Sequence, residues 1–335
     1  MKNIYIFLKL NRYIKSTRLK TVGIFLLHIS GKRYFGTFID PVCACNLRCR
    51  MCYFSDEEKR KEMLSKPFRE DHLPFIANAF FHRTLKLQIG CRAEPSLFAH
   101  NTELIHLAKE KKVPYISMTT NANLLNEKQL REFVEAGLNE ITLSMHGVRK
   151  ETYEYFMQGA SYEKFHESLQ ILSNLKKKYP KFKVRINYTV NQNNLEELAS
   201  LFDIFGNYHI DILQIRPIQP MGNTDYNNFS WKKIYEQYEE IIGKLKTECL
   251  QRHITCMTPN KYDLIKTENS SSAIMDSTYI YISPKVCWKT DFDLQKDTLD
   301  SYSKKHQLGR KLFLKIFKSQ QNIEQSKNLL NYDVL

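Results

Sequence analysis

Four cysteines lie close together near the start of the chain, at Cys43, Cys45, Cys49 and Cys52. The last three have the spacing C-x3-C-x2-C and follow the apolar run that ends at residue 39. A four-iron cubane has four metal corners, and three thiolates on one short loop hold three of them. The fourth iron then keeps an open coordination position, as a catalytic metal site requires. The spacing therefore predicts an iron–sulfur cluster with one exchangeable position.

The same cysteines allow another metal site. Four thiolates close a tetrahedral zinc shell, and Cys43 supplies a fourth sulfur. Structural zinc sites generally use two separated pairs of ligands, whereas a single residue divides Cys43 from Cys45. The cluster is the favoured interpretation, and a structural zinc protein is kept as an alternative.

Residues 45–53 resemble the cluster loop of the radical S-adenosylmethionine (SAM) superfamily, with Met51 where an aromatic residue is common and Cys43 as a bystander. In that family the open iron chelates SAM, and the reduced cluster cleaves SAM to methionine and a 5′-deoxyadenosyl radical. The resemblance implies a [4Fe-4S] cluster on Cys45, Cys49 and Cys52, SAM as cofactor, and an electron donor such as flavodoxin or ferredoxin. It leaves the catalytic residues unassigned.

Residues 90–95 are similar to the family's Gly-Gly-Glu-Pro segment, which meets the amino group of SAM. Glu94 and Pro95 match this pattern and are expected to bind the cofactor. Arg92 and Ala93 stand where glycines are usual, which puts the close backbone approach of glycine in question. A loop acid that caps the next helix is the alternative for Glu94.

Two later segments extend the resemblance. Residues 119–125 are similar to Thr-Asn-Gly-x-Leu-Leu, with Ala122 replacing the glycine, and Asn121 is expected to line the site or to form a turn. The sequence Ser144-Met-His146-Gly is similar to Ser-x-Asp-Gly. The resemblance makes Ser144 a SAM contact, and His146 is expected to be a surface histidine in a turn.

Strand alternation places two more polar residues at the same edge. Asn187 is expected to meet the ribose of the cofactor and Arg216 a carboxylate. Cys91, inside the Glu94 loop, is expected to be a packed free thiol rather than a redox partner or hydrogen-atom donor.

The remaining cysteines are Cys249, Cys256 and Cys287. Residues 279–287 are similar to the strand and cysteine of the SPASM/twitch-like extensions that hold auxiliary clusters in peptide-modifying members of the family. No cysteine follows Cys287, and Lys285 stands where a turn glycine is usual. The three thiols either hold a second iron–sulfur cluster or serve only in packing.

The fold class follows from alternating patterns. Short apolar runs at 34–39, 85–89, 114–118, 140–145, 183–190 and 210–215 predict strands, with amphipathic segments between them. Asn126 with Gln129, and Asn194, are expected to begin helices that end at Gly137 and Gly206.

Such strand–helix units predict an α/β protein with a partial (β/α)6 TIM-like barrel and its site at the carboxyl ends of the strands. A doubly wound open sheet is the runner-up. We expect a basic N-terminal extension over 1–33, the barrel over 34–228, and a helical or irregular extension over 229–335.

Charge adds information about partners. The chain of 335 residues has a net charge of +14. Eight cations precede the first acid, Asp40, and six more lie between 304 and 318. These runs indicate an anionic partner or a solvated face, and beside apolar residues they allow peripheral contact with a membrane surface. They do not predict a specific nucleic acid.

Localisation is expected to be cytoplasmic, including the inner membrane surface. No apolar run reaches the roughly 20 residues of a membrane span, and the apolar stretch of residues 4–8 is too short for a signal peptide. In a reducing compartment, eight cysteines are metal ligands or free thiols rather than disulfides.

The expected function is reductive cleavage of SAM and hydrogen-atom abstraction from a peptide, a protein or an anionic cell-envelope precursor. The subclass, oxidoreductase or transferase, is left open. A non-catalytic cluster-binding protein on the same barrel is the alternative, since Arg92, Ala93 and Ala122 replace glycines.

Overall fold

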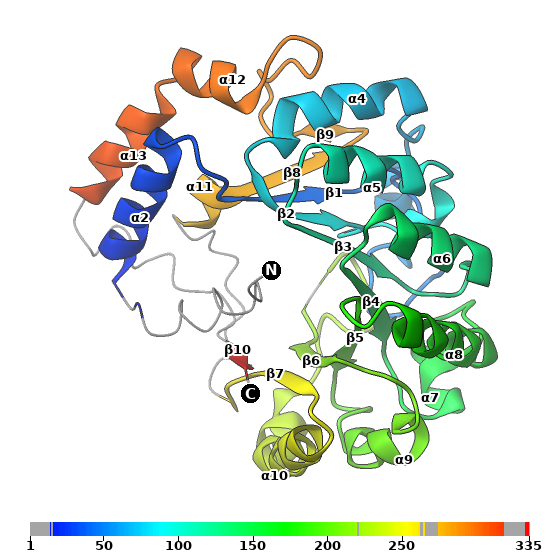
Figure 1. The fold of residues 1–335 in the computed structure, drawn as a ribbon. Helices are drawn as coiled ribbons and strands as arrows, with labels where there is room; N and C mark the ends of the chain where they lie inside the picture. The colour runs from blue at the N-terminus through cyan, green and yellow to red at the C-terminus, as the bar shows by residue number, and fades with distance from the viewer. Residues whose placement is uncertain are drawn as a thin grey trace.

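A computed structural model describes residues 14, 16–219, 221–261, 264, 274–317 and 332–334 of the chain. Its centre is one ten-stranded sheet in the order β10-β7-β6-β5-β4-β3-β2-β1-β8-β9. The strands from β7 to β8 in this order are all parallel, and antiparallel β9 and β10 lie at the two edges. The sheet curves without closing, and the helices between successive strands lie outside it (Figure 1).

The six predicted strands are all present and correspond to β1 to β6. The strands in the described residues are β1 (Phe35–Ile39), β2 (Thr84–Ile89), β3 (Tyr115–Thr120), β4 (Glu140–Met145), β5 (Lys183–Val190), β6 (Ile212–Pro217), β7 (Thr255–Pro259), β8 (Tyr279–Ser283), β9 (Val286–Cys287) and β10 (Tyr332–Val334). Because the connecting helices cover one face only (Figure 1), the partial barrel is confirmed and the doubly wound sheet is not.

The helices follow the strand–helix alternation. They are α2 (Thr17–Ile29), α3 (Glu57–Met63), α4 (Leu73–Ile76), α5 (Asn101–Glu110), α6 (Glu127–Ala136), α7 (Lys150–Phe156), α8 (Tyr162–Lys178), α9 (Leu201–Phe205), α10 (Trp231–Gln251), α11 (Met275–Thr278), α12 (Leu299–Lys305) and α13 (Leu308–Ile316). Within the described residues, no helix is both long and apolar enough to cross a membrane.

One of the two predicted helix starts is correct. Asn126 and Gln129 form a reciprocal capping box at the start of α6, and Gly137 ends this helix in the left-handed conformation with φ 113°. Asn194 caps no helix, so that prediction was wrong. Its amide instead donates to the carbonyl oxygens of His146 and Thr189, each at 2.9 Å.

The two faces of the sheet differ in chemistry. Ile141, Leu143 and Met145 of β4 are fully buried in the hydrophobic core. The alternate residues of the same strand, Glu140, Thr142 and Ser144, are polar. Successive side chains of a strand point to opposite faces, so the face away from the core presents polar groups to the interior of the barrel.

The predicted N- and C-terminal extensions meet at one side of the barrel. The first of them contributes α2 and the second α12 and α13, and Phe25 of α2 packs on Phe313 of α13 with ring centroids 5.5 Å apart. The second also provides β7 and β8, which join the main sheet beside β6 and β1. Of the basic residues at the two ends, Lys2, Lys9, Arg12, Lys15 and Lys318 lie outside the described residues.

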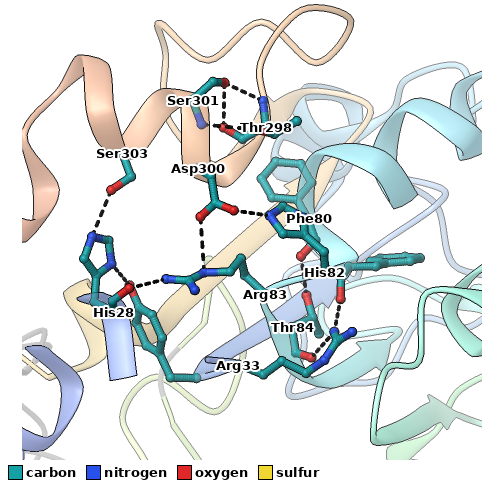
Figure 2. Close-up of polar contacts among 12 residues, drawn as sticks. His28, Arg33, Phe80, His82, Arg83, Thr84, Thr298, Asp300, Ser301 and Ser303 are labelled. Carbon is teal, nitrogen blue, oxygen red and sulfur yellow. Dashed lines mark hydrogen bonds and ion pairs between the residues drawn. The ribbon is translucent and has the colours of Figure 1, made fainter. Parts of the chain in front are cut away.

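Arg83 links the extensions to the barrel (Figure 2). This arginine precedes β2, is only 3% exposed, and donates from Nη2 to the carbonyl oxygen of His28 in α2 at 2.8 Å. Its Nε lies 3.4 Å from a carboxylate oxygen of Asp300 in α12. The His28 ring bridges Tyr34 at 2.8 Å and Ser303 at 2.9 Å. Segments far apart in the sequence therefore share one polar network.

We expect Arg83→Met to destabilise the protein by about 2 kcal/mol, because the Asp300 carboxylate and the His28 carbonyl lose a buried donor. Urea unfolding followed by tryptophan fluorescence measures this, since Trp288 packs 5.2 Å from Tyr302 of α12. The matched control is Arg131→Met, whose partner Glu127 is exposed on α6. It should change stability by less than about 0.5 kcal/mol. Equal effects of the two variants would contradict the assigned role.

Candidate cluster and cofactor site

The cysteine loop leaves the carboxyl end of β1 and is held by backbone contacts. The N–H groups of Arg48 and Arg50 donate to the carbonyl oxygens of Gln158 and Phe156, both at 2.9 Å. The Arg48 guanidinium donates to the carbonyl oxygen of Cys45 at 2.8 Å. The loop that carries the three predicted metal ligands is therefore anchored to the end of α7.

The three thiols of Cys45, Cys49 and Cys52 lie near one another. Burial raises the pKa of Cys49 well above its usual value, and negative charge on Cys52 and Cys45 raises this pKa further. Burial also raises the pKa of Cys45, to about 12. Thiols in such surroundings stay protonated until a cation compensates the thiolates. A metal cluster bound by all three sulfurs supplies that positive charge.

Glu94 lies beside this loop at the carboxyl end of β2. Its backbone N–H donates to the carbonyl oxygen of Ala44 at 2.9 Å. Its carboxylate, in a side chain that is 3% exposed, accepts from Thr120 at 2.6 Å and from the backbone N–H of Asn121 at 2.8 Å. It also accepts from the backbone N–H and hydroxyl of Ser96. Burial nevertheless raises the pKa of Glu94.

The predicted helix-capping contact of Glu94 is thus present. Its bond from the Ser96 N–H caps the short 3-10 helix Pro95–Leu97. Pro95 is buried at the first position of that helix and faces Gly90.

Asn121 also comes next to the cysteine loop. Its amide nitrogen donates to the Asn46 side chain at 2.8 Å and lies 4.0 Å from the Cys45 sulfur. Ala122 adopts a left-handed backbone conformation with φ 64°. The turn therefore keeps the glycine-like geometry that the resemblance implies, although alanine is disfavoured there.

Asp40 is a site residue that the sequence analysis missed. This carboxylate, 1% exposed at the end of β1, accepts from the backbone N–H groups of Cys91 at 2.7 Å, Arg92 at 3.0 Å and Ala93 at 3.4 Å. It also accepts from the Tyr281 hydroxyl at 2.8 Å. Its position immediately after the first apolar run was the available signal.

The glycine that the Glu94 loop needs is Gly90, rather than the positions of Arg92 and Ala93. Gly90 has φ 76°, and a Cβ there would lie 2.4 Å from the carbonyl oxygen of Thr119. Asp40 then holds the next three N–H groups, so the loop remains fixed without further glycines.

Ser144 and Asn187 are neighbours in paired strands β4 and β5. Asn187 is 8% exposed, and its Oδ1 has no hydrogen-bond partner among the described residues. A buried acceptor without a donor is unfavourable in the free protein. It fits a ligand that brings a hydroxyl or amino group to this place.

His146 is not the surface histidine that was expected. It is half-buried, and its Nδ1 has no hydrogen-bond partner among the described residues. Burial, together with a smaller contribution from the positive charge of Arg216, lowers the pKa of His146 to about 4. Arg216 lies at the end of β6, exposed, within electrostatic reach of both His146 and Cys91.

The C-terminal cysteines do not come together. Cys249 and Cys256 are both fully buried, and their thiols contact each other between α10 and β7. Cys287 lies in β9, at the opposite edge of the sheet. The predicted second cluster on these three cysteines is therefore not supported.

Across the described residues, no three or more His, Cys, Asp or Glu side chains converge on a single metal ion. This includes the thiols of the cysteine loop. In a cubane each thiolate binds a different iron atom, so cluster ligands stand further apart than those of one zinc ion.

Comparisons with known proteins agree with this geometry. The family model described as "Radical SAM superfamily" matches residues 39–205, from the last residue of β1 to the end of α9. A relative described as a probable GTP 3′,8-cyclase, from Saccharolobus solfataricus, is 27% identical over 211 residues. That match covers 62% of this chain and 65% of the relative. A cyclase of the same description from Metallosphaera sedula is 25% identical, with 62% and 64% covered. The chain thus matches less than two thirds of the length of these relatives.

Solved structures support the fold alone. The enzyme anSMEcpe with bound AdoMet and a peptide superposes with a TM-score of 0.58 at 15% identity, over 86% of this chain and 84% of the other. Streptococcus suis SuiB superposes with a TM-score of 0.58 at 16% identity, over 78% and 61%.

The parallel partial barrel, the three-cysteine loop after its first strand and the matching family model all agree. The chain belongs to the radical SAM superfamily, whose enzymes use a [4Fe-4S] cluster and S-adenosylmethionine.

Proposed function

We propose that this protein cleaves SAM reductively and removes a hydrogen atom from an organic substrate. The observation that carries the proposal is the meeting of the three-cysteine loop with Glu94 and Asn121 at the carboxyl ends of β1, β2 and β3. When bound, the cluster and SAM would supply the one-electron reduction and the hydrogen-atom abstraction, and the residues named here would hold and orient them. An electron donor such as flavodoxin or ferredoxin is required.

The residues present fit these cofactors. Cys45, Cys49 and Cys52 would hold three iron corners and leave the fourth open. The Asn121 amide nitrogen lies 4.0 Å from the Cys45 sulfur. The negative charge of Glu94 is near enough to raise the pKa of Cys45. They would orient the amino acid end of SAM beside the open iron.

Further along the sheet, the unpartnered Oδ1 of Asn187 would accept from a ribose hydroxyl, and Ser144 lies next to it. Pro95 would shape the turn that carries Glu94. These assignments follow the mouth of the barrel from β1 to β5.

The substrate is a separate question. The peptide-bound complexes of anSMEcpe and SuiB favour a peptide by analogy of fold. The cyclase relatives act on GTP by name, and the charge of +14 favours an anionic substrate, including a cell-envelope precursor. Two exposed arginines at the mouth, Arg92 and Arg216, favour the anionic class.

We expect Cys49→Ala to abolish 5′-deoxyadenosine formation, because two thiolates cannot retain the cubane. Anaerobically reconstituted protein is incubated with SAM and dithionite, and iron, sulfide and 5′-deoxyadenosine are quantified. The wild type should carry about four iron atoms per chain. Cys43→Ala is the matched control and should retain cluster and activity. Zinc without iron, lost on Cys43→Ala, would establish the zinc alternative. An intact cluster that forms no 5′-deoxyadenosine would establish the non-catalytic one.

We expect Asp40→Asn to weaken SAM binding about tenfold while leaving the iron content unchanged. An amide offers one acceptor oxygen, and its NH2 group faces the donors that now converge on the carboxylate. The Glu94 loop should lose its fixed position. Titration of the reduced cluster with SAM, followed by electron paramagnetic resonance, gives the affinity.

The control for Asp40→Asn is Asp203→Asn, which changes an exposed carboxylate in the first turn of α9. It should bind SAM like the wild type. Unchanged affinity in Asp40→Asn would refute the positioning role, and parallel loss of iron would show that Asp40 supports the whole loop instead.

A further inference from the structure

A group of arginine and tyrosine side chains lies at the mouth of the barrel, on the side of β8. We call it the arginine–tyrosine cluster; its members are Cys91, Arg92, Arg216, Tyr279 and Tyr281. Cys91 and Arg92 follow β2, Arg216 is the penultimate residue of β6, and the tyrosines come from β8. The residues assigned above to SAM and its cluster come from β1 to β5, apart from Arg216.

Aromatic contacts order the centre of this cluster. The Arg92 guanidinium lies over the Tyr281 ring, 4.7 Å from its centroid. The Tyr281 hydroxyl is fixed by its bond to Asp40, and the Tyr53 hydroxyl donates to the carbonyl oxygen of Arg92. A guanidinium stacked in this way keeps its N–H edge available for a ligand.

The Tyr279 ring places a hydroxyl group next to the Cys91 sulfur. This ring stacks on Phe38 with centroids 4.5 Å apart, and its hydroxyl lies 3.9 Å from the Cys91 sulfur. Cys91 is exposed, whereas the other seven cysteines are buried or half-buried.

Within the described residues, no carboxylate forms an ion pair with either arginine of the cluster. Arg92 and Arg216 are both exposed, and in the described part of the protein neither side chain forms an ion pair or hydrogen bond. Arg83 and Arg185 show the contrast, since each has a carboxylate partner. The carboxylate of Asp40 is close but already accepts four hydrogen bonds.

Arg92 and Arg216 both act electrostatically on one atom, the Cys91 sulfur. Partial removal of the Cys91 sulfur from water and the negative charge of Asp40 raise the pKa of this thiol, whereas the Tyr279 hydroxyl, Arg92 and Arg216 each act to lower it. Both guanidinium groups therefore lie within electrostatic reach of the Cys91 sulfur, although β2 and β6 are four strands apart in the sheet.

We propose that the arginine–tyrosine cluster is the substrate subsite and binds an oxyanion of the substrate, a carboxylate or phosphate, between Arg92 and Arg216. Guanidinium groups bind such anions with paired N–H donors. The Tyr279 hydroxyl is available as a further donor. The proposal rests on the proposed function, because it places the substrate beside the cofactor residues at the carboxyl ends of the strands. Arg216 then binds the carboxylate or phosphate of the substrate rather than the carboxylate of SAM.

The test uses Cys91 as an internal reporter. Anaerobically reconstituted protein with bound SAM is alkylated with iodoacetamide, and mass spectrometry follows the peptide that contains Cys91. Pyrophosphate and malonate are the phosphate and carboxylate probes, with sodium chloride at matched ionic strength as reference. A bound anion shields the sulfur and offsets the arginines, so alkylation should slow by about threefold or more.

Arg92→Gln should remove most of this protection. Its matched control, Arg131→Gln, changes an exposed arginine of α6 and should be protected like the wild type. Protection by only one probe would identify the anion class. Absence of protection in the wild type, or equal protection in Arg92→Gln, would overturn the proposal. Formation of 5′-deoxyadenosine by the same wild-type sample separates this failure from failure of the proposed function.

Discussion

The parallel registration of β1 to β6 is the constraint on which the site depends. It brings the carboxyl ends of these strands to one edge, so that loops from different parts of the sequence become neighbours. The loop after β1 contacts the loop after β2 through Ala44 and Glu94, and the loop after β3 through Asn46 and Asn121. A slip of one residue in any pair would exchange the polar inner side chains with the apolar outer ones. The apolar outer face therefore fixes the chemistry of the inner one.

Features that depend on local sequence were predictable. The six strands appear as apolar runs, and the capping box of Asn126 with Gln129 is a contact between residues three apart. The positions of the cysteine loop, Glu94 and Asn121 follow from being at strand ends. Features that depend on distant contacts were not. Asp40 acquires its role from the backbone N–H groups of residues 91–93 and from Tyr281, 241 residues away. Likewise, the pattern alone did not show that β7 and β8 would extend the sheet on both sides.

Polar groups on the inner face divide into satisfied and unsatisfied sets. Below the mouth, Glu140 pairs with Arg185 at 2.7 Å and accepts from Tyr115 at 2.6 Å. Buried charges need such partners, and removing one of them is strongly destabilising. At the mouth, by contrast, Asn187, Arg92 and Arg216 present atoms that the described chain leaves without partners. The first set maintains the fold, and the second is available to ligands.

The cysteine loop combines rigidity with unfavourable electrostatics. Its backbone is tied to Phe156 and Gln158 by two hydrogen bonds. Its thiols, however, are held close together in buried surroundings that oppose ionisation. Iron must displace three protons to bind there, and cluster affinity therefore rises with pH. A loop built only for packing would gain nothing from placing three such thiols together. Deprotonation of these thiols is favourable only when a multiply charged metal centre occupies the space between them.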